Sequence, residues 1–141
     1  MTTRRDFIKD TLAGITIVGF MPSILMSCSE ESTTGSNTKT VTVDVTSLDA
    51  DGKALRSTLP NGTPIMVVRR PSLKFVTLEL ICTHEGCSGD SLALVAPGLQ
   101  CQCHGSRYDL DGNVTGGPAA RDLKTYTTTY DSVKNEVTIQ Y

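Results

Sequence analysis

With 141 residues, the chain has room for one small domain. Its 38% hydrophobic residues and net charge of −2 are ordinary for a globular protein, and this mildly acidic balance without a basic stripe argues against a nucleic-acid partner. Five cysteines in a chain of this length require individual accounting, and the compartment decides how they are interpreted.

The N-terminal segment indicates export. Thr3 to Lys9 resembles the twin-arginine export signal of bacteria, in which Arg4 and Arg5 are the paired arginines. An apolar stretch from Leu12 to Met26 follows, and at about 15 residues it is shorter than the roughly 20 that a helix needs to span a bilayer. Such a stretch is typical of the core of a signal peptide, so residues 1–28 are expected to be a signal.

The expected signal ends at Cys28. The residues from Ser23 to Cys28 resemble a bacterial lipobox, in which Leu stands three places before the cysteine and a small residue stands directly before it. Cys28 would then be the lipid-bearing first residue of the mature chain. One acyl chain binds membranes only marginally, whereas several hold a protein stably at the surface. The alternatives are an incidental cysteine and an uncleaved anchor helix.

Beyond the signal, the sequence predicts a tether and then an all-β domain. Residues 29–39 are rich in Ser, Thr and Gly without an apolar residue, as in a flexible linker. No helical periodicity follows residue 28, and residues 40–141 are expected to form a small β-sandwich or barrel. Strands are predicted at 41–45, 64–69, 75–81, 92–95, 99–101, 126–130 and 137–141, with a hairpin of 107–109 and 113–114 around an Asp-Gly turn.

Two short loops carry the chemistry of this domain. They read C-T-H-E-G-C from Cys82 and C-Q-C-H-G-S from Cys101, so that each offers a cysteine and a histidine, His84 in the first and His104 in the second. Two thiolates and two imidazoles are enough for one metal centre across both loops. Zinc accepts such ligands, but its usual spacing keeps the cysteines together and the histidines together. A [2Fe–2S] cluster with two histidines on one iron requires mixed loops of this kind.

At these residues the sequence resembles the Rieske [2Fe–2S] family, in its high-potential quinol–cytochrome c reductase type. The resemblance implies one [2Fe–2S] cluster as the cofactor. It implies that Cys82 and Cys101 bind one iron and that His84 and His104 bind the other. The alternatives are a zinc ribbon and a pair of disulfides with idle histidines.

The same resemblance implies a disulfide between Cys87 and Cys103, which stand at matching places in the two loops. An exported protein meets an oxidising compartment, where disulfides persist. Rieske ferredoxins and oxygenase domains generally lack this pair, so its presence favours respiratory proteins. The family fold further implies a large β-subdomain with a small cluster-binding subdomain inserted at about residues 77–121.

Two hydroxyl groups follow His104, at positions that the family uses. In quinol-oxidising Rieske proteins, the serine matching Ser106 bonds a bridging sulfide, and the tyrosine matching Tyr108 bonds the sulfur matching Cys82. Such donors stabilise the reduced, more negative cluster and so raise its reduction potential. The alternatives are a turn residue for Ser106 and a core aromatic for Tyr108.

Backbone segments near the loops complete the resemblance. Gly105 belongs to the same intact segment as the two hydroxyl residues, and Gly116 to Ala119, with Pro118, resembles the proline loop that covers the cluster from a third side. The alternative for this second segment is a flexible turn.

Two residues depart from the pattern of quinol–cytochrome c reductase. Glu85 stands where these proteins usually have an apolar residue that docks into cytochrome b, and Gln102 replaces the usual proline between Cys101 and Cys103. A carboxylate is costly to bury against an apolar surface unless it is paired. These departures leave the redox chemistry intact but bear on the docking partner.

Two hypotheses of function follow. The first is an electron-transfer subunit of a quinol-oxidising respiratory complex, anchored to the cytoplasmic membrane and facing the periplasm, with a cytochrome b-like subunit and a cytochrome c as partners. The second is an accessory carrier or the small Rieske subunit of a periplasmic molybdenum oxidase similar to arsenite oxidase. A zinc-binding lipoprotein is the remote alternative. No substrate pocket or catalytic acid–base pair is evident, so the isolated domain is not expected to be an enzyme alone.

Overall fold

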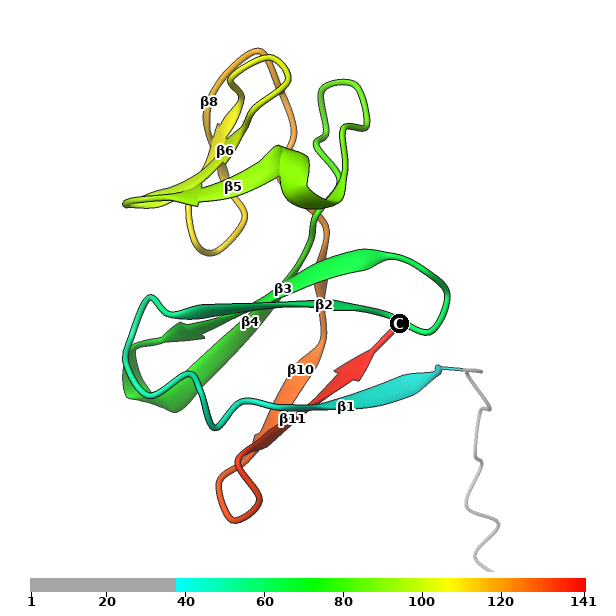
Figure 1. Cartoon of the computed structure of the whole chain (residues 1–141), viewed down its shortest axis with the longest axis vertical. Helices are drawn as coiled ribbons and strands as arrows, with labels where there is room; N and C mark the ends of the chain where they lie inside the picture. Colours follow the sequence, from blue (N-terminus) through cyan, green and yellow to red (C-terminus); the bar gives the residue numbers. More distant parts are fainter. Residues whose placement is uncertain (1–37) are drawn as a thin grey trace, which may run out of the picture. The chain divides into compact units, whose positions relative to one another are not determined.

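The computed structural model describes residues 38–141 (Figure 1). The expected signal peptide with Arg4 and Arg5, the expected lipidation site Cys28 and nearly all of the expected tether lie outside the described residues. Residues 38–141 form three antiparallel sheets, which confirms the predicted all-β fold class. In this part of the chain, no helix has the length and apolar character needed to cross a membrane.

The first sheet joins the two ends of the described chain. Its strand order is β1-β11-β10, with the bounds β1 (Thr40–Asp44), β10 (Thr128–Asp131) and β11 (Glu136–Gln140). Val41 lies opposite Ile139, and Val43 lies opposite Val137. Because alternate residues of a strand face the same side, these valines present the half-buried face that the sequence predicted. The predicted strands at both ends of the domain are therefore confirmed.

The second sheet has the order β2-β3-β4-β9, with the bounds β2 (Ala54–Thr58), β3 (Pro64–Arg70), β4 (Lys74–Glu79) and β9 (Thr125–Tyr126). The expectation of one strand over 126–130 is wrong, because β9 pairs with β4 whereas β10 pairs with β11. The chain changes sheets at Thr127, next to a local bond in which the hydroxyl of Thr128 donates to the carbonyl of Tyr126 at 2.9 Å.

Strand β3 is buried on both faces and separates two hydrophobic cores. Ile65 and Val67 belong to the core that the first sheet closes, whereas Met66 and Val68 belong to the core beneath the third sheet. All four side chains are at most 2% exposed. A continuous apolar run is what a strand with two covered faces requires. This explains why P-I-M-V-V lacks the polar alternation of β1.

The third sheet lies between β4 and β9 in the sequence. It has the order β5-β6-β7-β8, with the bounds β5 (Leu92–Val95), β6 (Gly98–Cys101), β7 (Arg107–Tyr108) and β8 (Val114–Gly116). Figure 1 shows these strands grouped apart from the other two sheets. A Cβ atom at Gly98 would meet the carbonyl oxygen of Tyr108, so the close approach of β6 to β7 requires glycine here.

Two arginines fasten the third sheet to the second. The guanidinium of Arg56 in β2 donates to the carbonyl of Gly89 at 3.0 Å and to the carbonyl of Leu92. Arg70 in β3 forms a two-pronged ion pair with Asp111, at 2.9 and 2.8 Å. Short 3₁₀ turns occupy η1 (Pro71–Leu73) and η2 (Gly89–Ser91). These contacts hold the third sheet, and the loops that it carries, in place against the second sheet.

Candidate metal centre

The two cysteine–histidine loops share one backbone frame. In the first, the N–H of Cys82 donates to the carbonyl of Cys87, and the N–H of Gly86 donates to the carbonyl of Cys82. In the second, Cys101 bonds Ser106 and Gly105 bonds Cys101 in the same way, all four distances being 2.7–2.9 Å. Gly86 and Gly105 both have positive φ, +75° and +80°, which glycine adopts without strain. This places Gly105 in a turn that forms the loop.

All four predicted ligands lie in these two loops. Cys82 and Cys101 are free cysteines and are buried, at 2% and 0% exposure. The rings of His84 and His104 lie beside each other, with centroids 5.0 Å apart and planes at 82°. The side chains of the two histidines are 27% and 46% exposed. The sulfur ligands therefore lie inside and the imidazoles at the surface.

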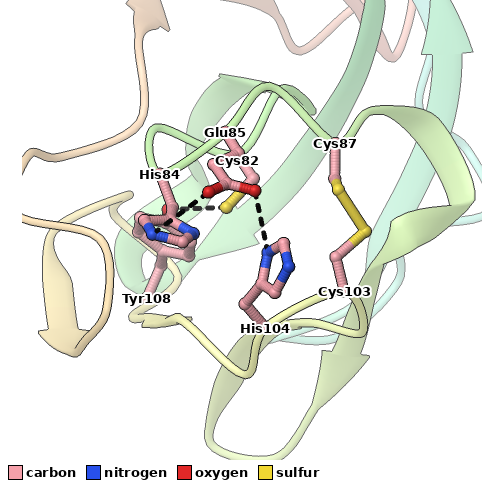
Figure 2. Close-up of a disulfide and its surroundings, with 7 residues drawn as sticks. All are labelled: Cys82, His84, Glu85, Cys87, Cys103, His104 and Tyr108. Carbon is pink, nitrogen blue, oxygen red and sulfur yellow. Dashed lines mark hydrogen bonds and ion pairs between the residues drawn. A yellow bond between two sulfur atoms is a disulfide. The ribbon is translucent and has the colours of Figure 1, made fainter.

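A hydrogen-bond network surrounds the sulfur of Cys82. The hydroxyl of Tyr108 lies 3.3 Å from this sulfur and accepts the backbone N–H of Thr83 at 3.2 Å. The hydroxyl of Thr83 lies 3.0 Å from the same phenol oxygen and donates to the carbonyl of Arg121 at 2.5 Å. Tyr108 is 1% exposed, so its ring also fills the core as the alternative interpretation supposed. The expected contact between Tyr108 and Cys82 is present (Figure 2).

This network favours the thiolate form of Cys82. Burial opposes its ionisation, but hydrogen bonds with Tyr108, the backbone of His84, Cys101 and Ser106 outweigh burial and hold the pKa of Cys82 below its ordinary 9.0. The pKa of Tyr108 is raised above 10.0 by burial and by its bond to Cys82. A phenol that keeps its proton beside a thiolate is a hydrogen-bond donor, and iron binds the thiolate form.

Ser106 is completely buried and connects the second loop to the segment after β8. Its hydroxyl oxygen accepts the N–H of Ala119 at 3.0 Å. The neighbouring Pro118 is exposed, so the expected proline loop meets the site through the backbone of Ala119. Because the serine oxygen accepts the N–H of Ala119, the hydroxyl proton of Ser106 remains available for an acceptor on the side of the buried cysteine sulfurs.

A disulfide joins the two loops. Cys87 and Cys103 are bonded, with Cα atoms 6.7 Å apart (Figure 2). The shared backbone frame, however, gives Cys87 the place of Ser106 in the other loop and gives Cys103 the place of His84. The expectation that the two cysteines occupy matching places is therefore wrong. The sulfur atoms of this bond and of Cys101 all lie within 4.8 Å of one another, so the disulfide borders the buried ligand.

Comparison with known proteins identifies this arrangement. The family profile described as the Rieske [2Fe-2S] domain matches residues 38–127. The chain belongs to the Rieske family. It is 32% identical to the cyanobacterial plasma membrane Rieske protein PetC3 from Synechocystis PCC 6803, with a TM-score of 0.60, over 72% of this chain and 99% of that one.

Two curated Rieske relatives add sequence similarity. The mitochondrial Rieske subunit of the rat cytochrome b-c1 complex (Rattus norvegicus) is 36% identical over 51% of this chain and 25% of its own length. The iron–sulfur subunit of the cytochrome b6-f complex from Synechococcus sp. (strain JA-3-3Ab) is 31% identical over 58% of this chain and 47% of its own length. The match with this chain thus spans between a quarter and a half of the length of these two relatives.

The residues of this Rieske domain fit a [2Fe–2S] cluster, which is the cofactor of the family and of this chain. Cysteine sulfurs and imidazole nitrogens are the donors that such a cluster needs. Within residues 38–141, the Nδ1 atom of His84 is buried and has no hydrogen-bond partner. A buried polar nitrogen without a partner is unfavourable unless it binds another group, such as a metal.

Sequence reasoning missed two contributors to the site. Thr83 bridges Tyr108 and the carbonyl of Arg121 from the position between the two ligands of the first loop. Glu85 places its carboxylate beside both imidazoles, whereas the sequence indicates only a docking position for this residue. A hydroxyl or carboxylate directly next to a ligand in sequence is the signal that would have singled out each of them.

Proposed function

We propose that this chain carries single electrons in a quinol-oxidising respiratory complex. The supporting observation is the pair of loops with one backbone frame, which bring two buried cysteines and two surface histidines together under a disulfide. Two relatives that match it are subunits of cytochrome b-c1 and b6-f complexes. The partners in this proposal are a cytochrome b-like membrane subunit as the site of quinol oxidation and a cytochrome c as acceptor.

In this proposal each side chain has a distinct task. Cys82 and Cys101 bind one iron, and His84 and His104 bind the other. When bound, the cluster supplies a one-electron couple whose potential is raised because neutral imidazoles replace two thiolates. Tyr108 and Ser106 direct hydroxyl groups toward the sulfur side, and burial there excludes water. The histidines remain half exposed, so an electron donor can approach them from solvent.

The centre is tested on the full chain, purified anaerobically after expression with ample iron. We expect a red-brown protein with two irons and two sulfides per chain and a rhombic EPR signal after reduction. Cys82→Ser and His104→Ala should each abolish this signal, whereas Asp90→Asn on the exposed turn η2 should keep it. Zinc in place of iron in the wild-type chain would overturn the proposal.

The partner is tested by isolating the tagged chain from solubilised membranes. A quinol-oxidising complex predicts b-type haem in the isolated material, seen by its reduced absorption bands, and quinol-dependent reduction of cytochrome c. The alternative function, an accessory carrier or the small subunit of an arsenite-oxidase-like enzyme, predicts molybdenum without b-haem. The exposed carboxylate of Glu85 is the observation that keeps this alternative, because an apolar docking crater would not accommodate it.

For location, we propose twin-arginine export, lipidation of Cys28 and attachment to the outer face of the bacterial cytoplasmic membrane through a tether of residues 29–39. The support is the sequence of the N-terminal segment alone. Labelled palmitate should be incorporated by the wild-type chain and lost in Cys28→Ala, and Arg4→Lys with Arg5→Lys should leave the precursor in the cytoplasm. Export of this double variant at the wild-type rate would refute the route.

A further inference from the structure

The carboxylate of Glu85 lies between the two imidazoles. Its Oε1 atom is 4.0 Å from Nε2 of His84, and its Oε2 atom is 3.6 Å from Nδ1 of His104 (Figure 2). The closest nitrogen and oxygen atoms of the three side chains all lie within 4.8 Å of one another. One negatively charged group thus faces both nitrogen ligands of the proposed centre, one oxygen toward each ring.

No basic side chain in residues 38–141 forms an ion pair with Glu85, whose only such neighbours are the two histidines. Other acidic groups of this domain differ, since Asp49 pairs with Lys53 and Glu79 pairs with Lys124. The charge of Glu85 is therefore not cancelled by a neighbouring cation. Because 61% of the Glu85 side chain is exposed, solvent weakens the electric field of its carboxylate. The field still reaches the imidazoles, because the distances of 3.6 and 4.0 Å are well inside a Debye length of about 8 Å.

The backbone keeps this charge in place. Glu85 directly precedes Gly86, whose N–H donates to the carbonyl of Cys82 at 2.9 Å and whose φ is +75°. The next residue but one, Cys87, is bonded to Cys103 in the loop that carries His104. The backbone that carries the carboxylate and the backbones that carry both rings therefore belong to one cross-linked unit, which keeps the charge within reach of the histidines.

A fixed negative charge makes the uptake of an electron nearby less favourable. Each one-electron reduction adds one negative charge to the centre between these side chains, and the donor that supplies the electron loses it. Tyr108 and Ser106 act in the opposite direction, because their hydroxyl groups stabilise added negative charge on the sulfur side. The two faces of the centre thus carry opposing influences, with the carboxylate on the histidine face.

We propose that Glu85 sets the reduction potential of the cluster, holding it below the value that the same loops would give with a neutral residue at this position. This inference rests on the proposed function, since it takes His84 and His104 as iron ligands. Glu85 binds no iron itself and acts on the cluster through the two histidine ligands, beside which it holds a negative charge.

The test is the midpoint potential of the full chain, measured by film voltammetry at one pH near neutrality. Glu85→Gln removes the charge and keeps the shape, and Glu85→Lys reverses the charge. We expect the potential to rise from wild type to Glu85→Gln and further to Glu85→Lys, with Glu85→Asp close to wild type. Added salt should shrink the difference between wild type and Glu85→Gln, an effect that a purely structural role would not produce.

Asp90→Asn is the matched control. Asp90 lies five positions further along and carries a fully exposed carboxylate, and within residues 38–141 its only ion pair is with Arg56, at 3.5 Å. The substitution Asp90→Asn removes one negative charge, as Glu85→Gln does, but from a side chain that does not face the histidines. Its shift in midpoint potential should therefore be several-fold smaller. Equal shifts in Glu85→Gln and Asp90→Asn, or a potential that falls in Glu85→Lys, would overturn the inference. Absence of the EPR signal from the wild-type chain would instead refute the proposed function, so the two failures are distinguishable.

Discussion

The phenol oxygen of Tyr108 lies 3.3 Å from the sulfur of Cys82, although the two residues are 26 positions apart in the chain. β7 thus delivers a hydroxyl from the strand after the second loop to the ligand of the first. The contact is buried, and the pKa shifts of its two members favour a protonated phenol beside a thiolate. Such a charge-assisted bond is stronger than one between neutral groups.

Tyr108→Phe should lower the midpoint potential of the cluster. The variant removes a hydroxyl that stabilises negative charge on the sulfur, and it leaves the ring that fills the core. We also expect a loss of about 1 kcal/mol in the free energy of unfolding, because the N–H of Thr83 loses its acceptor. Voltammetry and denaturant unfolding measure the two effects.

Tyr130→Phe is the control for this variant, since its hydroxyl bonds Asn135 in the hairpin between β10 and β11, away from the metal centre. It should leave the potential unchanged. Identical potentials for Tyr108→Phe and the wild-type chain would show that the phenol is only a core residue.

Ser106→Ala should lower the potential and also destabilise the domain. The serine oxygen is the acceptor for the N–H of Ala119, and both groups are buried. An unpaired buried donor costs about 1–3 kcal/mol, so the free energy of unfolding should fall by that amount. Ser106→Thr keeps the hydroxyl and should retain most of the potential. A midpoint potential that is unchanged in Ser106→Ala, or that falls equally in Ser106→Ala and Ser106→Thr, would contradict a role for this hydroxyl in tuning the cluster.

The disulfide should stabilise the domain and retain the cluster. Cys87 and Cys103 are 16 positions apart, and in the loop-entropy model a bond that closes about 15 residues contributes about 3 kcal/mol. The double variant Cys87→Ala and Cys103→Ala should therefore unfold at lower denaturant concentration and lose its visible absorption faster on heating. Dithiothreitol should reproduce both changes in the wild-type chain and have no effect in the double variant. If the reductant destabilises both proteins equally, the stabilisation comes from another source.

The stability of the β7–β8 hairpin should depend on pH through Asp109. Partial burial opposes ionisation of this carboxyl, but hydrogen bonds from the side chain and backbone of Asn113 and from the backbone of Asp111 outweigh it and lower the pKa of Asp109 from 3.8. Since the folded state binds this proton more weakly than the unfolded state, the contribution is present above pH 3.8 and is lost as the pH falls through the lowered pKa.

Asp109→Asn is the variant that tests this pH dependence. Its melting temperature should lie below that of the wild-type chain at pH 7, and the difference should disappear in strongly acidic solution. Asp122→Asn, which loses an exposed carboxylate bonded to the N–H of Val114, provides a comparison from the same region. A difference that stays constant from pH 7 into acid would contradict the assignment.

The sequence predicted the two loops well because their information is local. Cys82 with His84, and Cys101 with His104, are close in the chain, and each loop closes on a glycine that its turn requires. The strands with clear alternation or apolar runs were also predictable, as the valines of β1 and the buried run of β3 show. In such segments the pattern of one strand is enough to indicate its environment.

The remaining features depend on partners far away in the chain. β2 has no strong pattern of its own and is defined by its pairing with β3. The break between β9 and β10 reflects two different neighbouring sheets, which the run of Thr and Tyr does not show. Thr83 acquires its role only because Tyr108 and Arg121, 25 and 38 positions away, approach it. None of these relationships is contained in a short window of sequence.

Strand β3 has a consequence for how the molecule comes apart. Successive residues, Ile65 and Met66, contribute to different cores. If one core unfolds and β3 is lost with it, the other core loses the side chains that β3 contributes. We therefore expect the two halves to unfold in one cooperative transition, without a surviving half-folded species. A destabilising change far from the iron ligands, such as Val137→Ala in the first sheet, would then loosen the redox centre and the remote sheet to the same degree.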